Sequence, residues 1–145
     1  VNMGHSDATY RQAVEGKKAG ATGVTHIFNA IRPFHHREPG LPGLGLLDED
    51  LFVEVIADGV HLHSKTLEMI FSMKRLDRIM LVSDSVKGRR GRCTPVYDKK
   101  KNVLAGSTIT LRDAIAVLTR AGIPGVEAVQ AAMENPARYL NNSNQ

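Results

Sequence analysis

Apolar residues recur along the chain in short continuous runs separated by segments of helical periodicity. Three runs rich in branched and aromatic side chains predict buried strands over residues 24–28, 51–57 and 78–82. A shorter apolar lead over residues 1–4 predicts a fourth strand. Strands without polar alternation, interleaved with helices, are typical of a parallel sheet. The pattern therefore predicts an α/β fold.

Helix start signals follow the predicted strands. Ser6 or Asp7 is expected to cap a helix that runs to about Ala19, and Ser64 is expected to cap another that runs to about Arg75. The second segment places Leu67, Ile70 and Phe71 on one face, as a helix that packs on a sheet requires.

The second half of the chain has its own start and turn signals. Thr110 and Asp113 have the spacing of a capping box and predict a helix, and two shorter helices are expected after it. Residues 29–45, rich in Pro, Gly, His and Arg, are predicted to form a long functional loop. Residues 96–104 predict a β-hairpin around a basic turn.

The number of strands limits the possible architectures. Four parallel strands with their helices fill about half of a (β/α)8 barrel, which typically needs about 250 residues. The chain has 145 residues, so we expect half of such a barrel, a single partial domain over residues 1–145. A small doubly wound sheet is the alternative.

Composition excludes several classes of protein. The single cysteine, Cys93, excludes an intrachain disulfide, a four-cysteine zinc site and an iron–sulfur cluster, and it favours a reducing, cytoplasmic location. No apolar run approaches the roughly 20 residues that span a membrane. The net charge of +4 favours an anionic partner. Aromatic residues make up only 5% of the chain, which argues against a single-stranded nucleic acid as that partner.

Ionisable and polar residues follow each of the four predicted strands. The carboxyl ends of parallel strands meet at one edge of the sheet, where α/β proteins build their sites. We therefore expect one shared site that contains His5, His26, Asn29, Asp58, His61 and Asp84.

Two of these residues favour a metal site. His5 and His26 are the natural ligand pair for zinc or iron, although a catalytic zinc usually has three protein ligands. The third ligand is expected from elsewhere, most simply a carboxylate; Asp84 is one candidate, but its position better suits a general base. His61 could bond to a substrate oxygen. On the long loop, Arg37 could bind a phosphate in a bidentate fork, or belong to a solvated charged run.

Seven short motifs, in order along nearly the whole chain, resemble those of N-acetylglucosamine-6-phosphate deacetylases, of the amidohydrolase superfamily. They are residues 4–9 (GHSDAT), 25–30 (THIFNA), 37–40 (REPG), 56–61 (IADGVH), 81–84 (LVSD), 104–108 (LAGST) and 135–137 (NPA). The resemblance implies a zinc- or iron-dependent hydrolase that converts N-acetylglucosamine 6-phosphate to glucosamine 6-phosphate and acetate.

The resemblance also implies a role for each matching residue. His5 and His26 would bind the metal. Asp84 would take a proton from the water at the metal and deliver it to the leaving amine. His61 would contact the sugar and help to polarise the amide.

The remaining matches concern substrate binding. Asn29 and Ala30 would contact the substrate phosphate, and Arg37 would reach the phosphate in a neighbouring subunit, which implies a homodimer. The substrate pocket would be lined by Leu104, Ala105 and Gly106.

Members of that family are longer than this chain. They carry a small β-sandwich and a first half-barrel, and a glutamate of that half is the third metal ligand. We therefore expect the chain to be the C-terminal half of the barrel, to bind metal weakly and turn over little substrate alone, and to pair with another copy or with its missing half. The alternatives are a catalytically inactive half-barrel that acts in assembly, and a deacetylase of a related sugar such as N-acetylgalactosamine 6-phosphate.

Overall fold

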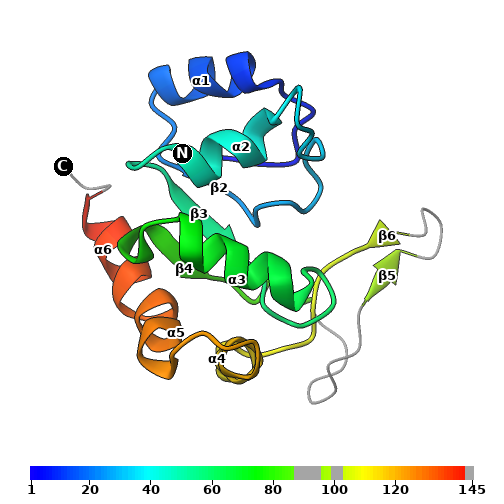
Figure 1. The fold of residues 1–145 in the computed structure, drawn as a ribbon, viewed down its shortest axis with the longest axis vertical. Helices are drawn as coiled ribbons and strands as arrows, with labels where there is room; N and C mark the ends of the chain where they lie inside the picture. The colour runs from blue at the N-terminus through cyan, green and yellow to red at the C-terminus, as the bar shows by residue number, and fades with distance from the viewer. Residues whose placement is uncertain (87–95, 99–102, 143–145) are drawn as a thin grey trace.

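A four-stranded parallel sheet forms the centre of the computed structural model, which describes residues 1–86, 96–98 and 103–142 (Figure 1). The strands pair in the order β1-β2-β3-β4. Their bounds are β1 (Asn2–Met3), β2 (Gly23–Val24), β3 (Phe52–Val55) and β4 (Ile79–Leu81).

Strand order decides between the two predicted architectures. Each strand lies beside the next one in the chain, and the connections contain α1 (Tyr10–Lys18), α2 (Gly40–Leu47) and α3 (Ser64–Met73). Right-handed crossovers in sequential order put all three helices on the same face, as in a barrel, whereas a doubly wound sheet needs a point where the order reverses. Helix α2 contacts both α1 and α3. The predicted α/β fold with four parallel strands is confirmed, and the doubly wound alternative is wrong.

Helix α2 corrects the prediction of a loop over residues 29–45. Its sequence, GLPGLGLL, has weak helix propensity, yet all but its last residue are buried. A Cβ at Gly45 would lie 3.1 Å from Val24 and 3.3 Å from Ile27, so the missing side chain lets the helix lie close to the sheet. Burial outweighs propensity here because the helix packs against β2 and β3.

Three other predicted boundaries were wrong. The strand expected over residues 24–28 is only Gly23–Val24, and residues 25–28 form a turn. Helix α1 is capped by Thr9 in a capping box with Gln12, rather than by Ser6 or Asp7. Helix α3 is capped by the His63 side chain, which accepts a hydrogen bond from the backbone N–H of Lys65.

The C-terminal elements agree better with the sequence. Strands β5 (Tyr97–Asp98) and β6 (Val103–Leu104) form the predicted antiparallel hairpin, and Thr110 caps α4 (Leu111–Arg120) in the predicted box. Helices α5 (Gly125–Ala132) and α6 (Glu134–Asn142) follow. The basic turn predicted within the β5–β6 hairpin falls on residues 99–102, which, like Cys93, lie outside the described residues.

Asn135 ties α6 to the sheet. Its side chain is fully buried, and its Nδ2 donates to the carbonyl oxygens of Leu76, in the 3-10 helix η1 (Leu76–Arg78), at 2.7 Å and of Ile79, in β4, at 2.8 Å. This accounts structurally for the NPA motif. None of the helices within the described residues is long and apolar enough to span a membrane.

Candidate active site

A cavity of about 590 Å³ opens where the parallel strands end. Every predicted site residue lines it except Arg37 and Asp58, and Asp58 instead contacts the lining residue His61. Phe28 and Val103, which the sequence did not indicate, line it as well. The complete lining is His5, His26, Phe28, Asn29, Ala30, His61, Asp84, Val103, Leu104, Ala105 and Gly106.

The two histidines expected to share a metal meet in this cavity. The Nε2 atoms of His5 and His26 are 3.0 Å apart, and the rings are inclined at 69°. The His26 side chain is buried, and its Nδ1 has no hydrogen-bond partner within the described part of the chain. Two nitrogen ligands of one tetrahedral zinc ion, each at about 2.0–2.1 Å, lie roughly 3.3 Å apart, so this pair fits two positions of such a set.

The described residues do not complete that set. Residues 1–86, 96–98 and 103–142 contain no group of three or more His, Cys, Asp or Glu side chains that could hold a metal ion together. Asp84 lines the same cavity but does not join the two histidines in such a group. Among the described residues, the pair could therefore supply two ligands of a metal but not a complete set.

The backbone around the cavity is strained. Among the described residues, five that are not glycine have a positive φ angle, and all five line this cavity: His5 (47°), His26 (28°), Phe28 (72°), Ala30 (49°) and Asp84 (44°). Such conformations cost of order 1–3 kcal/mol each and are typical of functional sites. The strain therefore distinguishes this cavity from the others.

His61 is held by the carboxylate of Asp58. Their side chains are each 4% exposed, and His61 Nδ1 lies 2.7 Å from Asp58 Oδ2. The other oxygen, Oδ1, accepts the backbone N–H groups of Val60 at 2.9 Å and of His61 at 2.8 Å. Burial would raise the Asp58 pKa, but the hydrogen bonds from the His61 ring and the two backbone groups outweigh it and lower that pKa. Asp58 is therefore ionised at neutral pH.

A parallel bridge between Ser85 and Ser107 brings residues 104–106 beside Asp84. Ser107 donates its backbone N–H to the Asp84 carbonyl oxygen at 2.9 Å and its hydroxyl to the Ser83 carbonyl oxygen. Gly106 has a φ of +117°, and a Cβ there would lie 2.8 Å from the Asp84 carbonyl oxygen. This glycine is therefore required for the close approach.

Arg37 lies outside the cavity, on an ordered turn. A bridge between His35 and Glu38 closes the turn, and Arg37 Nη1 lies 2.9 Å from His36 Nε2. The Glu38 carboxylate accepts the backbone N–H of Tyr10 at 2.7 Å, which fastens the turn to α1. Arg37 is exposed, so it does not reach the cavity of its own chain.

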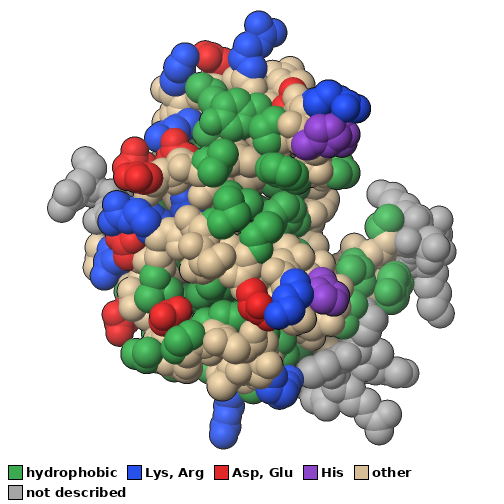
Figure 2. Space-filling model, in the orientation of Figure 1, with side chains coloured by type: hydrophobic (Ala, Val, Ile, Leu, Met, Phe, Trp, Pro, Cys, Tyr) green, Lys and Arg blue, Asp and Glu red, His purple; other side chains and the backbone are tan. Residues whose placement is uncertain are grey.

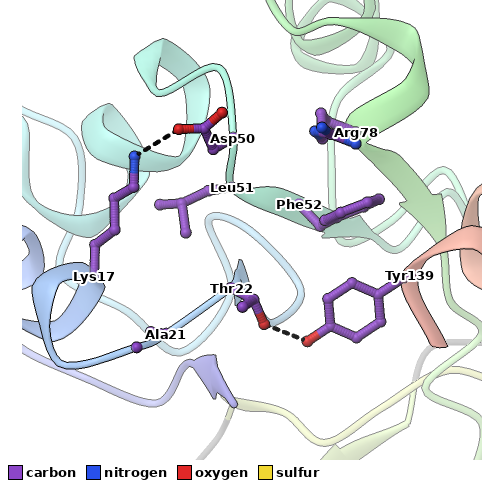
Figure 3. Close-up of a pocket in the computed structure, with 9 residues that line it drawn as sticks. Lys17, Ala21, Thr22, Asp50, Leu51, Phe52, Arg78 and Tyr139 are labelled. Carbon is purple, nitrogen blue, oxygen red and sulfur yellow. Dashed lines mark hydrogen bonds and ion pairs between the residues drawn. The ribbon is translucent and has the colours of Figure 1, made fainter. Parts of the chain in front are cut away.

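A cavity of about 380 Å³ lies at the opposite, amino ends of the strands (Figure 3). Its charged groups already have partners: Lys17 Nζ is 3.2 Å from Asp50, and the Arg78 guanidinium stacks on the Phe52 ring at 4.7 Å. In barrels, the amino-terminal face contributes to stability and the carboxyl-terminal face carries the chemistry. We therefore interpret this second cavity as structural.

Nearly the whole chain is similar to part of known amino-sugar phosphate deacetylases. The N-acetylglucosamine-6-phosphate deacetylase of Lysinibacillus sphaericus is 34% identical over 142 residues, which are 97% of this chain. The N-acetylgalactosamine-6-phosphate deacetylase of Escherichia coli O157:H7 is 34% identical over 154 residues, again with 97% of this chain covered. The chain spans only 35% and 41% of the lengths of these relatives. No protein-family model matches it.

Solved deacetylase structures are similar to this chain over nearly its whole length as well. The N-acetyl-D-glucosamine-6-phosphate deacetylase of Mycobacterium smegmatis, a mutant solved in complex with N-acetyl-D-glucosamine-6-phosphate, superposes with a TM-score of 0.86 at 31% identity, over 97% of this chain and 42% of that one. The resemblance to N-acetylglucosamine-6-phosphate deacetylases is confirmed. The deacetylase from Thermotoga maritima has a TM-score of 0.82 at 29% identity, over 98% of this chain and 43% of that one.

Proposed function

We propose that this chain supplies part of the active site of an enzyme that deacetylates N-acetylglucosamine 6-phosphate to glucosamine 6-phosphate and acetate. The observation that carries the proposal is the convergence of His5 and His26, with Nε2 atoms 3.0 Å apart, in the cavity that Asp84 also lines. The deacetylases that resemble the chain along nearly its full length supply the substrate class.

The two histidines would hold a divalent metal ion, zinc or alternatively iron. The metal would supply the Lewis-acid chemistry that makes water a nucleophile near neutral pH. Because the described residues offer only two ligands in one place, we propose that a carboxylate from another segment of the enzyme completes the set.

Asp84 is the proposed general base and acid. Its carboxylate accepts a proton from the attacking water as the water oxygen bonds to the acetyl carbon. The same proton then passes to the amide nitrogen as the C–N bond breaks, which releases acetate and the amino sugar. Its place on the cavity wall, fixed by the bond from Ser107, supports this role.

The remaining wall would bind the sugar phosphate. Asn29 and Ala30, in the turn after β2, are proposed to contact the phosphate, and His61 a sugar oxygen. The Asn29 side chain is held by the carbonyl oxygens of His26 at 3.3 Å and Ile27 at 3.2 Å, so the turn is positioned before substrate arrives. Residues 104–106 would close the pocket opposite.

A second copy of the chain is the proposed source of the phosphate-binding arginine. An entirely apolar groove between α2 and α3 is lined by Phe34, Leu46, Leu47, Met69 and Met73 among others, and Figure 2 shows hydrophobic side chains gathered over these helices. The groove lies beside the turn that carries the exposed Arg37, because Phe34 lines it. A homodimer through this groove would bury apolar surface and bring each Arg37 toward its partner. We also propose a cytoplasmic location, which suits a chain with one cysteine.

N-acetylgalactosamine 6-phosphate is the second candidate substrate. The relative from Escherichia coli O157:H7 named for that substrate matches this chain at 34% identity, as does the glucosamine-type relative from Lysinibacillus sphaericus. A half-barrel that only assembles with other chains is the remaining alternative, and it predicts no metal at the histidine pair.

The metal content of the purified chain tests the proposal. Zinc and iron are measured by elemental analysis in the unaltered chain, in His5→Ala and in the matched control His36→Ala, an exposed histidine outside the cavity. We expect weakly held metal in the unaltered chain and in the control, and its loss from His5→Ala. Equal metal in all three proteins would refute the site.

Acetate release from the two epimeric sugar phosphates identifies the substrate. The chain alone should turn over little of either, and more once the segment that supplies the third ligand is added. Full activity of the chain alone would refute the proposal that the third ligand comes from a segment outside this chain.

A further inference from the structure

The turn over residues 58–61 fixes its histidine through one buried carboxylate. One carboxylate, that of Asp58, uses Oδ1 to accept two backbone N–H groups of its own turn and Oδ2 to meet His61 Nδ1 at 2.7 Å. Both side chains are more than nine-tenths buried. Solvent therefore cannot replace either partner, and the orientation of the ring is set by this contact.

The contact also decides where the ring proton lies. An ionised carboxylate only accepts hydrogen bonds, so the ring nitrogen that faces Asp58 Oδ2 must be the one that carries hydrogen. In the neutral ring this places the proton of His61 on Nδ1. Nε2 then has a lone pair, and it is the ring nitrogen left for the cavity that His61 lines.

We propose that Asp58 is a positioning residue for His61, which it holds with the proton on Nδ1 so that Nε2 accepts a hydrogen bond from a substrate hydroxyl. This inference rests on the proposed function and makes one part of it specific. A neutral ring in this state can accept from a sugar hydroxyl, but it cannot donate to the acetamide carbonyl. The structure thus favours sugar recognition over amide polarisation as the role of His61.

Two other histidines give internal references. The Nδ1 of His63 accepts the backbone N–H of Lys65 at 3.2 Å, and the Nδ1 of His35 accepts the backbone N–H of Arg37 at 3.2 Å. An accepting Nδ1 places the proton on Nε2 in the neutral ring. His61 is therefore expected to differ from both in the same sample.

The test is 15N NMR of the labelled full chain at about pH 8, above the ordinary histidine pKa of about 6.5. We expect His61 to show a protonated Nδ1, and His63 and His35 a protonated Nε2. This measurement needs no variant and no catalytic activity. A protonated Nε2 on His61 in the unaltered chain would overturn the proposal.

The Asp58→Asn variant reverses the bond without changing its shape. The amide oxygen can still accept the two backbone N–H groups, but the NH₂ group then donates to His61 Nδ1 and moves the ring proton to Nε2. We expect the 15N signals of His61 to show that the protonated nitrogen changes from Nδ1 to Nε2, while the signals of His63 stay unchanged. The control Asp50→Asn, at an exposed carboxylate, should change the signals of neither histidine. A folded Asp58→Asn chain with unaltered His61 signals would overturn the proposal. If the variant does not fold, the 15N measurement on the unaltered chain decides by itself.

Addition of N-acetylglucosamine 6-phosphate tests the acceptor role. A shift of the His61 Nε2 signal, larger than that of His63, supports it. An unmoved signal in the chain that does bind the sugar phosphate overturns it. The metal content of His5→Ala decides the proposed function separately, since it depends on neither result.

Discussion

Gly106 offers the most direct test of how the cavity is built. It has a φ of +117°, and a Cβ at this position would lie 2.8 Å from the carbonyl oxygen of Asp84 and 2.9 Å from a methyl group of Val86. The Gly106→Ala substitution should therefore destabilise the chain and push the segment after β6 away from Asp84. Gly20 provides a matched control, because its φ is +102° and an added Cβ would have nothing within 4 Å.

The two substitutions separate backbone strain from collision. A positive φ costs an alanine about 1–2 kcal/mol, and both variants bear this cost. Overpacking against fixed atoms typically adds about 1–3 kcal/mol, and only Gly106→Ala bears it, since a backbone carbonyl cannot move aside like the end of a flexible side chain. We expect a loss of about 2–5 kcal/mol for Gly106→Ala and of about 1–2 kcal/mol for Gly20→Ala.

Urea unfolding followed by circular dichroism measures both losses. The slope of the transition must stay constant for the midpoints to be compared as free energies of unfolding. Metal retention supplies a second measurement, which should fall in Gly106→Ala and remain in Gly20→Ala. Equal destabilisation by the two substitutions would refute the reasoning, because the contact with Asp84 would then add nothing.

Three further predictions concern stability. Burial lowers the pKa of Lys74 to about 8, and the negative charge of Asp48 partly offsets this effect. Between about pH 8 and 10.4, Lys74 is therefore protonated in the unfolded chain but largely neutral in the folded one. The free energy of unfolding should consequently rise with pH over this range, by about 3 kcal/mol in total. Lys74→Met should lose this rise when unfolding is measured at pH 7 and pH 10; the same rise in the variant would contradict the assignment. Asn135→Ala removes the two hydrogen bonds that the buried amide donates to the carbonyl oxygens of Leu76 and Ile79, and it should cost about 2–4 kcal/mol in urea unfolding. A loss below about 1 kcal/mol would show that water replaces the amide. Thr110→Ala removes a helix cap and should cost about 1 kcal/mol, whereas Thr110→Ser should retain most of it; equal losses would argue against the cap.

Sequence reasoning succeeded where one local signal dominates. Strands β3 and β4 are short apolar runs, and α4 begins at a capping box whose two hydrogen bonds need only residues three apart. It failed where burial outweighs propensity. The glycines and proline of α2 are typical of a loop, but all residues except the last are buried, and packing against α1, β2 and β3 stabilises the helix.

The candidate site divides in the same way. The placement of His5, His26 and Asp84 after strands was sufficient to predict one shared rim, because parallel strands end together. The partner of His61 was not predicted, although Asp58 lies three residues away, because an aspartate before a glycine usually indicates only a turn. Phe28 reaches the cavity through a positive φ angle, which no propensity assigns to a phenylalanine.

The strained turns around the cavity set a limit on engineering. Glycine at position 30 would adopt the local φ of 49° at little cost and would be expected to raise thermal stability. The same change would loosen a wall that now holds one shape in advance of any ligand. At these few positions, a substitution that raises thermal stability is therefore expected to weaken the proposed catalytic site.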